Sequence, residues 1–152
     1  MRPRLPEELR SSIRGRDLNR CAYCHSPEML SVASFEIDHI VPLSAGGTTQ
    51  PDNLCLACPH CNRHKSSRLS APDPQSGNDA QVFHPRAQNW HEHFSWNEDG
   101  VTLVGLTATG RATIDLLDLN RERVLLLRRL WAKLGIPPWS SQSPSESMGE
   151  SV

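Results

Sequence analysis

Two Cys-x-x-Cys pairs constrain this chain more than any other feature of its sequence. Cys21 and Cys24 form the first pair, and Cys58 and Cys61 form the second. A tight turn at each pair can aim two sulfurs at one point, and four thiolates around a point make the closed tetrahedral site that structural zinc takes. The sequence therefore predicts a structural Zn²⁺ site that joins two distant segments.

Other readings of these cysteines are a redox dithiol, or thiols that pack without a ligand. Two matched pairs argue against both readings. The separation between the pairs exceeds the common zinc-ribbon spacing, so a folded segment must lie between them. Cys55 stands outside both pairs, and we expect it to be a small buried residue on a strand.

Length and composition fit a single modest domain with some irregular segments. The chain has 152 residues, of which 37% are hydrophobic, which suffices for one core rather than two. It has no run of about twenty apolar residues and no amino-terminal export signal, so we expect no membrane association and a cytoplasmic location. Thiols stay reduced in the cytoplasm and are free to bind metal.

The formal net charge of −1 hides three basic segments, residues 1–20, 62–68 and 121–133. Local basic surface can attract phosphates even on a nearly neutral chain. The alternative for each segment is a solvated helix face without a partner.

The first half of the chain carries signals for one helix, one hairpin and a second helix. Pro6 and two acidic residues in a first turn predict a helix over residues 6–16. Alternating polar and β-branched residues within 20–45 predict a short hairpin that ends at Pro42. A second helix is expected over residues 61–67.

The second half begins after residues 70–81, whose Pro, Ser, Gly and Asp content predicts a flexible linker. Asp99-Gly100 predicts a hairpin turn. Helical spacing of apolar residues then predicts a short helix, a break near Asn120 and a longer helix that ends at Leu134. The last residues, 139–152, have no core-forming pattern, and we expect them to be a disordered tail.

Asp38 and His39 stand between the two cysteine pairs, just before a loop rich in Pro, Ser and Gly. A histidine can take a proton from water near neutral pH. An aspartate offers a hard oxygen ligand for Mg²⁺ or Mn²⁺. Adjacent side chains on a strand point to opposite faces, so these two share a site only if the strand turns there, which Pro42 permits.

Polar residues after the second cysteine pair complete a candidate site. Asn62 directly follows Cys61, so a zinc turn would fix the direction of its amide oxygen, a possible second metal ligand. Asn53 is a candidate clamp that closes the backbone of the loop carrying the histidine. Candidate nucleic-acid contacts follow at Arg63, His64 and Lys65.

The segments CAYC, EIDHIVPLSAGG, DNL and CPHCNRHK, in this order, resemble the HNH nuclease superfamily. The resemblance covers residues 21–67 and points to the branch whose ββα-metal motif is wrapped by a four-cysteine zinc site. It implies an α+β fold, with a small zinc-stapled, treble-clef-like (His-Me finger) nuclease core. Residues 1–69 would be this core with its basic amino-terminal helix, and residues 82–138 a carboxy-terminal extension of a hairpin and helices.

The resemblance also implies a role for each motif residue. His39 would be the general base that activates water, Asp38 a ligand of the catalytic divalent ion, and Asn53 the structural clamp. The last position of the family pattern is often a histidine. This chain has Asn62 there, as in the HNN variety, in which asparagine serves as the ligand. Asparagine in place of histidine affects which divalent ion, Mg²⁺ or Mn²⁺, the site would prefer.

The sequence thus predicts a metal-dependent endonuclease that hydrolyses DNA and contacts it mainly through the backbone, with little sequence specificity. One alternative is a non-catalytic zinc module that binds nucleic acid or protein. Another is an interaction domain of the kind found in ubiquitin transfer, which usually binds two zinc ions. The joint presence of Asp38, His39 and Asn62 favours the nuclease.

The extension resembles one seen on many bacterial and cyanobacterial HNH proteins, and we expect it to pack on the core. Its histidines, His84, His91 and His93, are expected at the surface or in packing, because no cysteine or carboxylate pairs with them to make a second metal site. The apolar face of the last helix is the one feature that bears on oligomeric state.

Overall fold

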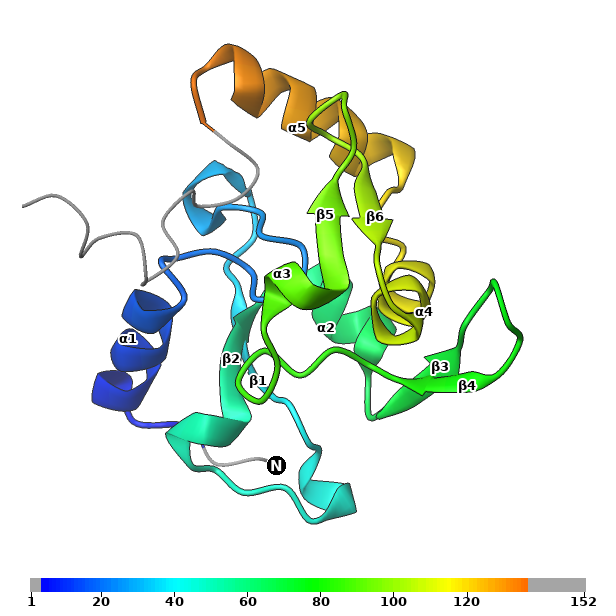
Figure 1. Ribbon diagram of the computed structural model, residues 1–152. Coiled ribbons are helices and arrows are strands. Elements are labelled where there is room, and N and C mark those ends of the chain that lie inside the picture. Colours follow the sequence, from blue (N-terminus) through cyan, green and yellow to red (C-terminus); the bar gives the residue numbers. More distant parts are fainter. Residues whose placement is uncertain (1–3, 137–152) are drawn as a thin grey trace, which may run out of the picture.

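The computed structural model describes residues 4–136 and contains short helices and three two-stranded antiparallel sheets within that range (Figure 1). The α-helices are α1 (Glu7–Arg16), α2 (Pro59–Lys65), α3 (Trp90–His93), α4 (Ala108–Leu117) and α5 (Glu122–Lys133). The strands are β1 (Glu36–His39), β2 (Leu54–Ala57), β3 (Ser70–Pro72), β4 (Asp79–Gln81), β5 (Phe94–Trp96) and β6 (Leu103–Gly105). The predicted α+β class is confirmed. The tail predicted over 139–152 lies outside the described residues.

Strands β1 and β2 and helix α2 form a ββα unit at the centre of the first half. In the antiparallel register, Asp38 lies opposite Cys55 and His39 opposite Leu54. The hairpin expected within residues 20–45 is therefore wrong in its partner, because β1 pairs with β2 across a long loop. Residues 20–30 instead form a turn closed by an Arg20–Pro27 bridge and a short 3₁₀ helix.

Helix α1 begins after Pro6, as predicted, and is tied to the rest of the fold at its carboxyl end. Asp17 accepts a hydrogen bond from the backbone nitrogen of Leu56 at 2.7 Å. The same carboxylate forms a two-pronged ion pair with Arg86, at 2.7 and 2.9 Å. One buried aspartate thus connects α1, strand β2 and the start of the extension.

Residues 70–81 are an ordered hairpin, β3–β4, and not the flexible linker that their composition predicts. Asp73 accepts hydrogen bonds from Gln75 and Ser76 within the turn. Arg111 on α4 binds both oxygens of Asp73, each at 2.9 Å. Pro, Ser, Gly and Asp favour tight turns as well as flexible chains, and here the ion pair to α4 selects the turn.

The extension contains the hairpin and the two helices that the sequence predicts. Strands β5 and β6 flank Asp99-Gly100, and α4 and α5 are separated around Asn120. Arg128 on α5 is fully buried and donates to the carbonyls of Val101 and Leu119, both at 2.8 Å. This arginine holds α5 against the hairpin, so part of the basic segment 121–133 serves the fold.

One hydrophobic core joins the two halves. Its buried members include Tyr23, Phe35 and Leu56 from the first half and Phe83, Trp90 and Phe94 from the extension. Figure 1 shows α3 and the β5–β6 hairpin beside the β1–β2 unit, with α5 along one end. None of the helices within residues 4–136 is long and apolar enough to cross a membrane.

The ion pair between Asp17 and Arg86 gives a first prediction. Replacing Asp17 with alanine leaves the charge of Arg86 without its carboxylate and the Leu56 nitrogen without its acceptor, and we expect a loss of roughly 3–5 kcal/mol of unfolding free energy. Urea denaturation measures the loss. Asp52→Ala is the matched control, because Asp52 is exposed and should change stability by less than about 0.5 kcal/mol. Equal losses in both variants would contradict this account.

Candidate metal and catalytic site

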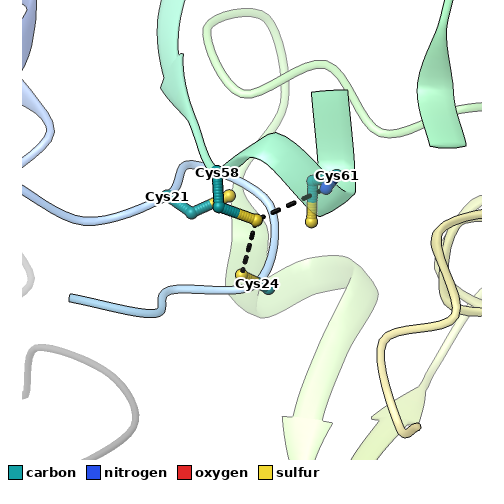
Figure 2. A group of neighbouring side chains, drawn as sticks. All are labelled: Cys21, Cys24, Cys58 and Cys61. Atoms are coloured by element: carbon teal, nitrogen blue, oxygen red, sulfur yellow. Dashed lines mark hydrogen bonds between the residues drawn. The ribbon is translucent and has the colours of Figure 1, made fainter. Parts of the chain in front are cut away.

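The four paired cysteines converge on one point, as the sequence predicts. Cys21 and Cys24 come from the turn after α1, and Cys58 and Cys61 from the start of α2 (Figure 2). All four are buried, and their sulfurs lie within 4.8 Å of one another. Among the described residues this is the one such group of metal-binding side chains.

The spacing of the sulfurs suits zinc. A tetrahedron with Zn–S bonds of about 2.3 Å has S–S edges of about 3.8 Å. The sulfurs of Cys24 and Cys58 are 3.8 Å apart. The backbone nitrogen of Cys61 donates to the sulfur of Cys58 at 3.3 Å, a contact that favours a thiolate. The cluster can therefore hold a metal ion such as zinc.

The thiols also influence each other's protonation. Hydrogen bonds from the neighbouring thiols, Cys21 first, lower the pKa of Cys24 well below its ordinary value. Burial raises the pKa of Cys21. Binding of a metal ion would release the remaining thiol protons, because thiolates are the ligands.

A cleft of about 360 Å³ lies beside the cluster, on the ββα unit. Its lining includes Asp38 and His39 from the end of β1 and Asn62 and Arg63 from α2. Neighbours on a strand point to opposite faces, but β1 ends at His39 and the chain bends toward Pro42. The three residues predicted to do chemistry therefore line one cleft.

Asp38 is a buried carboxylate, 7% exposed, with two partners that the sequence analysis did not anticipate. The Tyr23 hydroxyl donates to its Oδ2 at 3.0 Å, and the Lys65 ammonium lies 3.1 Å from the same oxygen. Burial raises the pKa of Asp38, while the charge of Lys65 opposes the rise. A paired carboxylate at the wall of a cleft can supply an oxygen ligand to a cation.

His39 is half-buried, and its ring is held by Thr49. His39 Nε2 lies 3.1 Å from Thr49 Oγ1, across the loop that follows β1. A histidine whose ring is fixed at one nitrogen can present the other to a reactant. Thr49 is therefore a candidate orienting residue. Nothing in the local sequence distinguishes it from Thr48.

Asn53 closes the loop that leads away from His39. Its side chain accepts a hydrogen bond from the backbone nitrogen of Val41 at 2.8 Å and donates to the carbonyls of Val41 and Thr48. Gly47 lies where this loop presses on the Val41 carbonyl, and a Cβ there would lie 1.8 Å from that oxygen. The side chain of Asn53 and the missing side chain of Gly47 together hold the loop beside the cleft.

Asn62 donates its amide nitrogen to the carboxylate of Glu36. A carboxylate can only accept, so this contact directs the amide nitrogen of Asn62 toward Glu36 and leaves the amide oxygen for another partner. Sequence reasoning missed Glu36. The available signal was its position two residues before Asp38, which places both carboxylates on one face of β1.

The three predicted phosphate contacts differ in their surroundings. Arg63 and His64 are exposed on α2, and the ring of His64 stacks on that of His60 at 3.9 Å. Lys65 is only 2% exposed and binds Asp38 and the His39 carbonyl. The expected phosphate contact by Lys65 is thus corrected, because its ammonium is already used inside the fold.

Other residues singled out in the sequence lie apart from the cleft. His84 accepts backbone hydrogen bonds from Arg86 and Ala87, and His93 bonds Thr107. His91 is exposed beside Trp90. Cys55 is fully buried on β2, as expected, and burial raises the pKa of its thiol.

Comparison with known proteins supports the motif. Residues 21–68 match the family model described as HNH endonuclease, which confirms the resemblance over that segment. This matched segment contains the four cysteines and the cleft residues Asp38, His39 and Asn62.

Two curated relatives are similar to parts of this chain. The Septu protein PtuB of Bacillus mycoides is 30% identical in an alignment 108 residues long that covers 54% of this chain and 36% of the relative. The CRISPR-associated endonuclease Cas9 of Corynebacterium diphtheriae is 41% identical over 49 residues, 32% of this chain and 4% of the relative. The chain thus spans about a third or less of the length of either relative. No solved structure matches it.

The four-cysteine cluster predicts a metal content of one zinc ion per chain. We expect Cys58→Ser to lose this ion and its cooperative thermal transition, because structural zinc contributes directly to folding. Elemental analysis and a thermal melt measure both effects. Cys55→Ala is the control and should keep one zinc ion, because Cys55 lies outside the cluster. Two zinc ions per chain would instead favour an interaction module.

The pair of Lys65 and Asp38 predicts a second loss of stability. Lys65→Met leaves a buried carboxylate without its counter-charge, and we expect unfolding free energy to fall by roughly 3–5 kcal/mol. Arg63→Met removes a positive charge from the same helix at an exposed position and should have little effect. Urea denaturation of both variants compares them. A Lys65 variant as stable as the Arg63 variant would contradict the pairing.

Proposed function

We propose that this protein is a metal-dependent endonuclease that hydrolyses phosphodiester bonds of DNA. One observation carries the proposal: Asp38, His39 and Asn62, from separate segments of the chain, line a single cleft within the part that matches the HNH endonuclease family. A zinc module without catalytic activity would need the four cysteines and none of these three side chains. The similarity to a relative named as an endonuclease points the same way.

The oxygen donors at the cleft suit a hard divalent cation. Asp38 would offer a carboxylate oxygen and Asn62 an amide oxygen, and Mg²⁺ or Mn²⁺ commonly completes such a set with water and substrate phosphate. A bound cation would neutralise charge on the phosphate and on the departing 3′ oxygen. In this proposal Glu36 is a positioning residue. Its carboxylate accepts a hydrogen bond from the amide nitrogen of Asn62, so the amide oxygen of Asn62 points away from Glu36.

His39 is proposed as the general base. When its Nε2–H donates to Thr49, Nδ1 keeps the lone pair that accepts a proton. The oxygen of a water molecule then bonds to phosphorus, the bond from phosphorus to the 3′ oxygen breaks, and the proton of the water passes to His39. Asn53 acts at a distance by holding the backbone of the loop that follows His39.

The substrate contacts at the cleft are proposed to be with phosphates, through Arg63 and His64. Little sequence specificity is therefore expected there.

We also propose a cytoplasmic location, since five cysteines without a disulfide suit a reducing compartment. Residues 1–69 would act as the catalytic unit, and residues 82–138 would stabilise it through the shared core.

Plasmid nicking tests the proposal. Zinc-loaded protein, washed free of other metals, should nick supercoiled DNA only when Mg²⁺ or Mn²⁺ is added. His39→Ala should reduce the rate by roughly 10²–10⁴-fold, the usual contribution of a general base. His91→Ala is the control, because His91 is an exposed histidine outside the cleft. Circular dichroism and zinc content check that each variant is folded.

The outcomes separate the candidate functions. Equal nicking by wild type and His39→Ala would remove His39 from the chemistry. If zinc-loaded wild type binds DNA but never cuts it with either ion, the non-catalytic binding module is favoured instead.

A further inference from the structure

A second depression, next to the catalytic cleft, has an unusual charge for this chain. It has a volume of about 380 Å³ and lies between the turn after Cys24, the start of α2 and the face of α5. Arg63, Arg121 and Arg123 line it, and none of its lining residues is an aspartate or a glutamate. The formal net charge of the whole chain is −1, so this concentration of positive charge is local. We call this depression the arginine groove.

Most other arginines of the basic segments are already used within the fold. Arg14 pairs with Glu28, and Arg16 donates to the carbonyls of Pro51 and Leu54. Arg128 is buried and donates to the carbonyls of Val101 and Leu119. Within residues 4–136, by contrast, Arg63 and Arg123 form no ion pair or hydrogen bond. Their charges are therefore available to a partner.

The arginine groove adjoins the catalytic cleft at Arg63, which lines both of them and lies on the helix that also carries Asn62. A strand whose phosphate sits in the cleft would therefore meet Arg63 and then Arg121 and Arg123 as it leaves. The groove also has apolar surface, from Phe35, Leu127 and Trp131. Guanidinium groups beside apolar surface suit a nucleic-acid strand, whose phosphates are joined by sugars that carry apolar base faces.

We propose that the arginine groove binds the phosphodiester backbone of the nucleic acid on one side of the scissile bond, with Arg121 and Arg123 of the extension as its contacts. This inference rests on the proposed nuclease function and gives the extension a role in holding the substrate. An acidic protein segment would meet the same charges. The shared lining residue Arg63 favours nucleic acid, because a protein ligand has no need to reach the catalytic residues.

The test compares one double variant with one single variant, both with arginines replaced at or near α5. Arg121→Gln with Arg123→Gln removes both groove charges at the start of α5, and Arg129→Gln removes an exposed charge of α5 that does not line the groove. Zinc-loaded proteins are titrated with labelled duplex and single-stranded DNA, without Mg²⁺ or Mn²⁺, over a range of salt concentrations. Nicking rates of the same proteins are then measured against DNA concentration.

The double variant should bind more weakly. The negative slope of log affinity against log salt should become shallower, by about 1.8 for duplex or about 1.4 for single strands, if each arginine contacts one phosphate. In nicking, its KM should rise while kcat stays unchanged, since neither residue lines the cleft. Arg129→Gln should behave as wild type in slope and KM, and the form of DNA that shows the larger change identifies the bound strand.

An unchanged salt slope in the double variant, with wild type still binding and cutting DNA, would overturn the groove proposal and leave the nuclease function intact. The groove would then suit an acidic protein segment. Wild type that neither binds nor cuts DNA would instead overturn the proposed function, and the groove proposal with it. Thermal melts of all variants check that each one is folded, so that weaker DNA binding is not caused by unfolding.

Discussion

The convergence of four buried sulfurs is the constraint on which the rest of this structure depends. It joins the turn after α1 to the first turn of α2, two segments separated by both strands of the central sheet. A metal ion held there would fix the start of α2 and, one residue beyond Cys61, the position of Asn62. Because α2 also carries Arg63 and Lys65, the same anchor sets the wall of the cleft and the partner of Asp38.

Asp38 shows how the fold holds a buried carboxylate at the wall of a cleft. Burial alone would favour its neutral form, but the Lys65 ammonium and the Tyr23 hydroxyl bind the charged one. The result is a fixed carboxylate with the cleft on one side and the core on the other. Tyr23 lies inside the first cysteine pair, so the four-cysteine cluster and the proposed catalytic site share a supporting residue.

The extension is part of the same folded unit rather than an attached module. Asp17 of the first half binds Arg86, and Asp73 of the β3–β4 hairpin binds Arg111 of α4. Arg128 fastens α5 to the β5–β6 hairpin, which leaves Arg121 and Arg123 on the side of the helix that meets the groove. The buried Arg128 thus serves the fold, while Arg121 and Arg123 of the same basic segment are proposed to serve binding.

The sequence by itself determined the metal cluster, the order of the motif residues and most of the helices, since these follow from local spacing, capping and turn chemistry. Only the tertiary structure decided the pairing of β1 with β2, the ordered hairpin over residues 70–81 and the burial of Lys65. Each of these depends on a partner far away in the chain, such as Arg111 for Asp73 or Asp38 for Lys65. A local pattern shows that a charge or a β-branched residue is present, but the residue that it contacts is set by long-range packing.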